Sequence, residues 1–301
     1  MPHVSRRAVL VGGGVVTAGA AAVGAGVHQG VLPGRPWLQA RLGLDGEDGV
    51  VPDVAPGRVR RGTFVSEARG GTSTGWAVVL PPGSARREEL PVVVALHGRG
   101  QDHAALLGPG LGLDRFLAAH TAAGGTPYAV AVVDGGDSYW HPRPSGEDSG
   151  AMVVDELLPL LAGQGLRAGP TDRIGLLGWS MGGYGALRLA GLLGAGRVAG
   201  VVAVSPALWT DPDDASPSGF ADAAEYEEFS VLGRQGDLEG VAVRVDCGTG
   251  DPFYRAAEEY VAGFPASAQV AGGFEPGGHT SGYWRRVLPA QLDFLGRTLD
   301  A

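Results

Sequence analysis

The strongest chemical signal in the sequence surrounds Ser180. This serine is the central residue of a G-x-S-x-G pattern at residues 178–182, placed between an expected strand at 174–177 and an expected helix at 183–193. A sharp strand-to-helix turn strains the serine backbone, projects its hydroxyl above the sheet, and points a helix dipole at developing negative charge. Such five-residue matches also arise by chance in a chain with 53 glycines. The junction nevertheless favours a nucleophile over an ordinary turn serine.

A base and an acid for this serine are sought downstream, because the matching fold uses the chain order Ser, acid, His. His279 is the only histidine after Ser180, and it lies in a Gly-Gly-His-Thr loop before the C-terminal helix. Two aspartates follow the expected strand at 241–245: Asp246 at its edge and Asp251 in the turn beyond. We favour Asp251, since a loop residue can reach across to His279, although aspartate is also common in turns. Asp246 stays open as the alternative.

An oxyanion hole needs backbone N–H groups rather than particular side chains. One is expected from Met181, directly after the nucleophile, and the other from Arg99, in the loop after the strand at 92–96. His97, Asp102 and His103 in the same loop are imaginable metal ligands. A His-Gly turn at this strand end is already explained by the oxyanion loop, so we expect no metal and no cofactor.

Alternating strands and helices must position these residues. The expected strands lie at 63–68, 76–80, 92–96, 129–133, 174–177, 198–204, 241–245 and 268–271. The expected helices lie at 115–120, 152–161, 183–193, 256–264 and 284–299. This alternation predicts a doubly wound, mostly parallel sheet of about eight strands, whose ligands gather at the carboxyl ends of the strands. With the nucleophile motif, it predicts an α/β-hydrolase domain at residues 58–301.

The N-terminal segment has the layout of an export signal. Arg6 and Arg7 precede an uncharged, glycine-diluted apolar run, and residues 1–28 are therefore predicted to be a twin-arginine-type signal. The run is also long enough to remain as a membrane anchor. Gly12-Gly13-Gly14 does not continue into a dinucleotide-binding pattern, because Thr17 occupies the third glycine position. Residues 29–57, rich in Pro and Gly, are predicted to be a linker or an extended arm over the domain.

Composition narrows the possible functions. The formal net charge is −9 without a basic stripe, which argues against nucleic acid as a partner. Cys247 is the only cysteine, so neither an intrachain disulfide nor a thiol-based metal cluster is possible. We expect contact with a membrane only through the N-terminal segment, and the sequence favours no particular oligomeric state.

With these residues in place, the chain resembles an esterase family that includes esterase D, S-formylglutathione hydrolases and the cell-envelope mycolyltransferases. The resemblance covers roughly residues 75–300 and rests on His97-Gly98, Asp137-Ser138-Tyr139-Trp140, Asp155-Glu156-Leu157-Leu158, residues 178–183, Ser205-Pro206-Ala207-Leu208-Trp209, residues 248–253, and His279 before Tyr283-Trp284. It implies hydrolysis of carboxylic esters or acyl transfer, and it implies that Asp251 is the acid. The segment 211–229 departs from the family pattern, which leaves the substrate open.

Four aromatic residues in loops on the catalytic side are candidates for lining an acyl pocket: Trp140, Trp209, Phe253 and Trp284. Each is about as plausible as a packing residue. The expected mechanism is two-step acyl transfer on a small-molecule or lipid-like ester, through an acyl-enzyme on Ser180. A cell-envelope acyltransferase would use the same triad with another acceptor. A non-catalytic binding module on this scaffold is disfavoured, because Ser, His and Asp are all retained.

Overall fold

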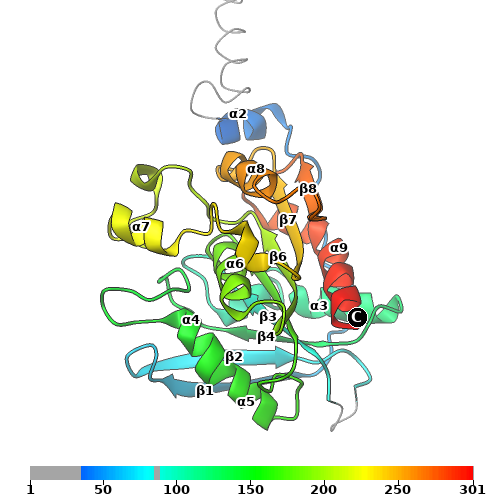
Figure 1. Ribbon diagram of the computed structural model, residues 1–301. Helices are drawn as coiled ribbons and strands as arrows, with labels where there is room; N and C mark the ends of the chain where they lie inside the picture. Colours follow the sequence, from blue (N-terminus) through cyan, green and yellow to red (C-terminus); the bar gives the residue numbers. More distant parts are fainter. Residues whose placement is uncertain (1–34, 85–88, 301) are drawn as a thin grey trace, which may run out of the picture.

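A computed structural model describes residues 35–84 and 89–300, and it shows one eight-stranded sheet flanked by helices (Figure 1). The strands are β1 (Val59–Ser66), β2 (Thr72–Val79), β3 (Val92–Leu96), β4 (Ala129–Val133), β5 (Ile174–Trp179), β6 (Val198–Val204), β7 (Ala242–Gly248) and β8 (Ala271–Glu275). Their order is β1-β2-β4-β3-β5-β6-β7-β8. The β1–β2 and β2–β4 pairs are antiparallel and all the others are parallel. The expected α/β-hydrolase architecture is thus confirmed.

The central strands owe their position to their composition. β3, β4 and β6 consist almost wholly of Val and Ala, and every residue in them is buried. A strand without polar alternation can only be stable when both of its faces are covered. These strands therefore occupy the middle of the sheet, and their carboxyl ends deliver the loops of the site to one edge.

Helices cover both faces of the sheet. They are α2 (Arg35–Leu42), α3 (Leu113–Ala122), α4 (Ser149–Ala151), α5 (Leu158–Gly163), α6 (Met181–Leu193), α7 (Ala223–Phe229), α8 (Tyr254–Ala262) and α9 (Ser281–Asp300). Buried side chains of α3 and α9 form one apolar cluster with the sheet, and those of α5, α6 and α8 form the other. Removing these two faces from water is the main stabilising contribution to the fold.

Several elements differ from the sequence expectations. β1 and β2 each begin four residues earlier than expected, and α7 has no counterpart among the expected helices. β8 begins at Ala271, where the expected strand ended, because pairing with β7 places the sequence AGGFE in the sheet despite its two glycines. The expected helix at 152–161 begins earlier, at Ser149, with Asp148 as its N-cap, and contains a π-helical stretch at Met152–Leu157. The residues before 57 include the helix α2.

Residues 36–57, here called the arm, include most of α2 and the stretch that leads from it toward β1. The amide of Gly49 donates to the Gly282 carbonyl (2.8 Å), and the guanidinium of Arg286 donates to the Asp45 carbonyl (3.2 Å). Val51 packs against the apolar cluster beneath α3 and α9. The predicted signal at residues 1–28 lies outside the described residues. Within the described part of the chain, no helix is both long and apolar enough to cross a bilayer.

Candidate active site

Ser180 occupies a strained turn between β5 and α6. Its backbone has φ 56° and ψ −119°, a conformation that is costly for any residue other than glycine. A Cβ at Gly178 would collide with the carbonyl of Gly182, and one at Gly182 would collide with that of Leu96. The Ser180 amide donates to the Val204 carbonyl (2.9 Å), which anchors the turn to β6. The two glycines of the motif are therefore required by the tightness of this turn.

His279 and Asp251 line up behind the Ser180 hydroxyl. His279 Nε2 lies 3.0 Å from Ser180 Oγ, and His279 Nδ1 lies 2.8 Å from Asp251 Oδ2. A carboxylate beside Nδ1 places the ring proton there, which leaves Nε2 free to accept the serine proton. The Asp251 side chain is fully buried, and its other oxygen accepts from the Phe253 amide (2.9 Å). The three residues thus form a continuous chain of hydrogen bonds.

Asp246, the alternative acid, is engaged elsewhere. Its carboxylate accepts two hydrogen bonds from the Arg244 guanidinium (2.8 and 2.9 Å) and one from Gln291 Nε2 (2.8 Å) on α9. Burial raises the pKa of this carboxyl, while the contacts with Arg244 and Gln291 oppose that shift. These partners hold Asp246 against α9, whereas Asp251 lies beyond the end of β7 and contacts the histidine.

His97 braces the loop that follows β3. Its Nε2 accepts from the Gly135 amide (2.9 Å), so the ring proton is on Nδ1, which lies 2.8 Å from the Gly98 carbonyl. Burial lowers the pKa of His97, which keeps the ring neutral and suits this pattern. Within the loop, the Gly98 amide donates to Gln101 Oε1 (3.1 Å). The chain between β3 and the next helical turn is therefore held from both sides.

The three residues that could be imagined as metal ligands have other partners. Asp102 caps the 3₁₀ turn η1 (His103–Leu106) by accepting from the Ala105 amide, and His103 Nδ1 lies 2.6 Å from Asp134 Oδ1. Both ring nitrogens of His97 are engaged as described above. No group of three or more His, Cys, Asp and Glu side chains within the described residues is arranged to hold a metal ion.

A cavity of about 380 Å³ opens over Ser180 and His279. Three of the predicted pocket residues line it: Trp209, Phe253 and Trp284. The rings of Phe253 and Trp284 pack edge-on against the His279 ring, with centroids at 5.4 and 5.2 Å. These contacts hold the imidazole from two directions and leave its side chain 27% exposed. Tyr139, Ser216 and Gln101 also line the cavity, and the sequence interpretation had not singled them out.

Trp140 does not line this cavity, which corrects the expectation. Its side chain is fully buried beneath the loop, 5.2 Å from the ring of His97 and directly against Gly135 and Gly185. The physical reason is local: Tyr139 and Trp140 both have φ 57°, and this pair of left-handed residues turns Tyr139 toward the cavity and Trp140 into the core. Of the two aromatic residues in the segment 137–140, Tyr139 lines the cavity and Trp140 does not.

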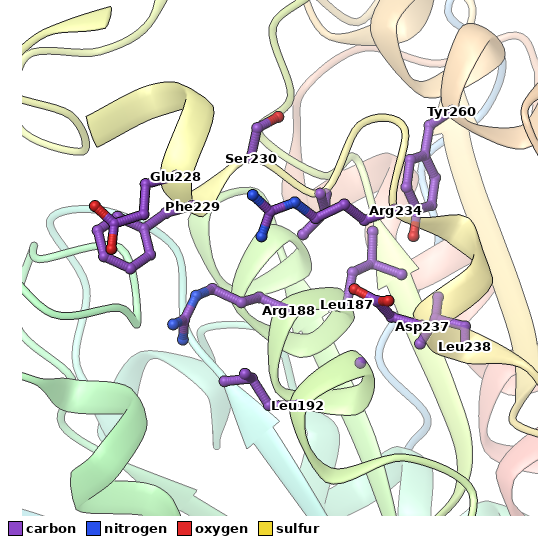
Figure 2. Close-up of a pocket in the computed structure, with 12 residues that line it drawn as sticks. Leu187, Arg188, Leu192, Glu228, Phe229, Ser230, Arg234, Asp237, Leu238 and Tyr260 are labelled. Atoms are coloured by element: carbon purple, nitrogen blue, oxygen red, sulfur yellow. The ribbon is translucent and has the colours of Figure 1, made fainter. Parts of the chain in front are cut away.

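A second cavity, of about 400 Å³, lies along the C-terminal half of α6 (Figure 2). Its lining includes Leu187, Arg188, Phe229, Arg234 and Tyr260. None of the three residues that form the hydrogen-bonded chain at Ser180 lines it. Arg188 donates to the Trp140 carbonyl (3.2 Å) and lies over the Phe229 ring at 5.3 Å, so it links α6 to two neighbouring segments.

Comparisons with known proteins agree with this architecture. A family model described as Putative esterase matches residues 67–295. A solved ferulic acid esterase is similar at 22% identity and TM-score 0.69, covering 80% of this chain and 98% of that one. An S-formylglutathione hydrolase from Agrobacterium tumefaciens is similar at 19% identity and TM-score 0.63, covering 84% and 99%. A ferulic acid esterase from Anaeromyces mucronatus, solved with ferulic acid, is similar at 18% identity and TM-score 0.63, covering 85% and 95%. No curated protein matches the sequence.

Proposed function

Because the chain belongs to the family described as Putative esterase and is a carboxylic ester hydrolase, we propose that it acts as a serine esterase through Ser180, His279 and Asp251. The observation that carries the proposal is the unbroken contact from Ser180 Oγ to His279 Nε2 (3.0 Å) and from His279 Nδ1 to Asp251 Oδ2 (2.8 Å). A hydroxyl is a weak nucleophile at neutral pH, and an adjacent oriented base activates it.

In the proposed mechanism, His279 takes the proton of Ser180 as the serine oxygen attacks the ester carbonyl. Asp251 holds the imidazole in the required tautomer and stabilises its positive charge. Collapse of the tetrahedral intermediate transfers the proton from His279 to the leaving alcohol and leaves an acyl group on Ser180. Water, deprotonated by His279, then attacks this acyl-enzyme and releases the carboxylic acid.

The main-chain amides of Met181 and Arg99 are proposed to stabilise the oxyanion. Met181 is the first residue of α6, so its N–H lies at the positive end of the helix dipole. Arg99 lies between two engaged neighbours: the Gly98 amide bonds Gln101, and the Gly100 amide bonds Asp137 Oδ1 (2.6 Å). These flanking hydrogen bonds fix the loop before the substrate arrives, which is what preorganised stabilisation requires.

Ser180→Ala tests the proposal in one step. Hydrolysis of 4-nitrophenyl esters of graded chain length should fall by about 10³-fold or more, because the nucleophile is removed while the fold is retained. His279→Ala should cause a loss of the same order. Ser73→Ala is a suitable control, because Ser73 is exposed on β2, in the antiparallel part of the sheet. Near-normal activity of purified Ser180→Ala protein would refute the proposal.

We also propose that residues 1–28 export the enzyme through the twin-arginine route, on the basis of Arg6-Arg7 before an uncharged apolar run. Changing both arginines to lysine keeps the charge but removes the paired guanidinium signal. Fractionation of cells should then show the double variant retained in the cytoplasm. Undiminished export would overturn the route and leave the hydrolase assignment intact.

A further inference from the structure

The active-site cavity is lined almost entirely by uncharged groups. Aromatic rings, Ser216, Gln101 and Gly98 surround Ser180 and His279. Of the described residues that line the cavity, Arg99 is the one with a permanent charge, and it is exposed. A single cation at the wall of a half-enclosed, largely apolar cavity sets the electrostatic preference for whatever enters.

Arg99 forms no ion pair with the described residues around it. None of the ion pairs among the described residues includes Arg99. The neighbouring acid, Asp137, is exposed and directs Oδ1 to the Gly100 amide (2.6 Å), and Asp102 caps the next 3₁₀ turn. The guanidinium is therefore free to bind an anion from solution or from a substrate.

The position of Arg99 indicates which part of an ester it would meet. The leaving alcohol must lie against His279, because that residue gives it a proton. Arg99 lines the cavity together with Tyr139. Its positive charge opposes the rise in the phenol pKa that burial causes and to which Asp137 adds. Tyr139 is separated from His279 by two further rings: Tyr139–Trp209, Trp209–Phe253 and Phe253–His279 centroids are 5.8, 5.3 and 5.4 Å apart. The Arg99 end of the cavity is therefore the acyl end.

We infer that Arg99 makes the enzyme selective for esters whose acyl chain carries a carboxylate, such as half-esters of aliphatic dicarboxylic acids. The inference rests on the proposed function, and it assigns Arg99 a second role through its side chain, apart from that of its amide. A guanidinium binds a carboxylate by two parallel, charge-assisted hydrogen bonds, whereas the neutral methyl ester of the same acid offers only a carbonyl acceptor without a counter-charge.

Paired substrates isolate this effect. The 4-nitrophenyl half-esters of adipic and suberic acid each have a neutral counterpart, the corresponding 4-nitrophenyl methyl diester. The quantity to measure is the charge ratio, defined as kcat/KM for the half-ester divided by kcat/KM for the methyl diester. We expect the better of the two acids to give a charge ratio about fivefold higher in the wild type than in Arg99→Gln, the size of an exposed ion pair. Because the ratio cancels any change in the chemical step, it reports only the charge preference.

Controls separate the charge of Arg99 from the shape of its side chain and from the overall charge of the protein. Arg99→Lys should keep most of the charge ratio, and Arg61→Gln, at an exposed position on β1 in the antiparallel part of the sheet, should leave it at the wild-type value. Raising the salt concentration from about 20 mM to 0.5 M should reduce the wild-type ratio at least twofold, because the Debye length shrinks below the width of the cavity. An equal ratio in wild type and Arg99→Gln would overturn the inference.

A binding measurement keeps the two proposals distinguishable. In the Ser180→Ala background, calorimetry should show tighter binding of the half-ester than of the methyl diester, and the added change Arg99→Gln should remove the difference. This result would support the role of Arg99 even if the proposed catalytic residues were wrong. Hydrolysis of both substrates by Ser180→Ala protein would count against the proposed function alone, and equal binding of both would count against Arg99 alone.

Discussion

The two walls of the active-site cavity are held in different ways. On one side, loops after β7 and β8 carry Asp251 and His279. The Gly49 amide of the arm donates to the Gly282 carbonyl (2.8 Å) in the first turn of α9, directly after the second of these loops. On the other side, the segment 211–229, here called the cap, is held mainly by side chains of the body. Rings pack around Phe220, Arg143 pairs with Glu225 (3.0 Å), and the side chains of His141 and Tyr184 bond the carbonyls of Gly219 (2.8 Å) and Phe229 (2.7 Å). A backbone hydrogen bond thus ties the triad wall to the arm, whereas side-chain contacts, mostly aromatic, hold the cap.

This difference teaches how one scaffold can keep its chemistry and change its substrate. Backbone hydrogen bonds specify positions closely, as proton transfer over about 3 Å requires. Aromatic packing tolerates exchanges of similar volume, so the cap can vary without displacing the triad. We therefore expect changes on the triad wall to lower kcat, and changes in the cap to raise KM.

The largest effect is expected at Asp251. Asp251→Asn should lower kcat on the order of 10⁴-fold, because an amide at this position favours the wrong tautomer of His279. Asp246→Asn is the matched control five residues earlier, and it should leave kcat within a few-fold. That change should instead destabilise the protein by roughly 3 kcal/mol, since it leaves Arg244 without its buried partner. Steady-state kinetics and urea unfolding of both variants check this, and exchanged outcomes would identify Asp246 as the acid.

Breaking the ion pair of the cap should act on substrate binding. Glu225→Gln leaves Arg143 partly buried without its counter-charge, which should lower the free energy of unfolding by about 3 kcal/mol. KM should rise several-fold while kcat changes little. Glu227→Gln, an exposed position in the same helix, serves as the control and should resemble the wild type. A fall in kcat without a change in KM would mean that the cap, too, positions the triad.

The cap should also be weakened by mild acid through His141. This ring is fully buried between Phe220 and Phe229, at 5.1 and 4.6 Å, and burial lowers its pKa from 6.5 to about 4. Between pH 6.5 and 4 the unfolded chain binds a proton that the folded protein does not, so stability is complete above pH 6.5 and declines as the pH falls toward 4. From pH 7 to 5 the loss due to His141 is about 2 kcal/mol.

Chemical denaturation across this pH range checks the His141 prediction. The free energy of unfolding of His141→Gln should fall less steeply from pH 7 to 5 than that of the wild type. Comparing slopes removes any constant destabilisation caused by the substitution. Parallel slopes for the two proteins would show that another group carries the acid sensitivity.

A smaller effect is expected from loosening the arm. A Cβ at Gly49 would collide with the backbone at the start of α9, so Gly49→Ala should displace the arm from the loop of His279. We expect kcat to fall by about tenfold. This is less than the roughly 10²-fold loss that a 1 Å misplacement of a catalytic group can cause. Gly196→Ala is the control, because a Cβ there meets nothing within 4 Å. Unchanged kcat in Gly49→Ala would show that the two loops are held without the arm.

The features that could be predicted from the sequence are those encoded in short stretches of the chain, such as apolar strands and the motif around Ser180. Ser180 and the loop of Asp251 follow β5 and β7, whose apolar runs are readable without any tertiary contact, so their convergence at one sheet edge could be foreseen. His279 could be foreseen because it is the only histidine after Ser180. The choice between Asp251 and Asp246 could not be made from position alone. It depends on Arg244 and Gln291, which approach Asp246 only in the folded chain.

Other features depend on backbone conformations that residue types do not announce. Because Tyr139 and Trp140 both have left-handed φ values, Tyr139 rather than Trp140 faces the cavity. Neither residue type favours that conformation, so the sequence does not indicate it. The helix α2 was obscured by Pro36, which interrupts a helix interior but is tolerated in the first turn. β8 has little strand propensity of its own and is defined by its ladder with β7.

The central claim, that Ser180 becomes acylated, is tested most directly by trapping the intermediate. Wild-type protein mixed with a 4-nitrophenyl ester and quenched in acid should show one acyl group by intact mass spectrometry, located on the peptide that contains Ser180. The same treatment should leave Ser180→Ala protein unmodified. An acyl group on another residue, or full turnover by a protein that cannot be acylated at Ser180, would contradict the account.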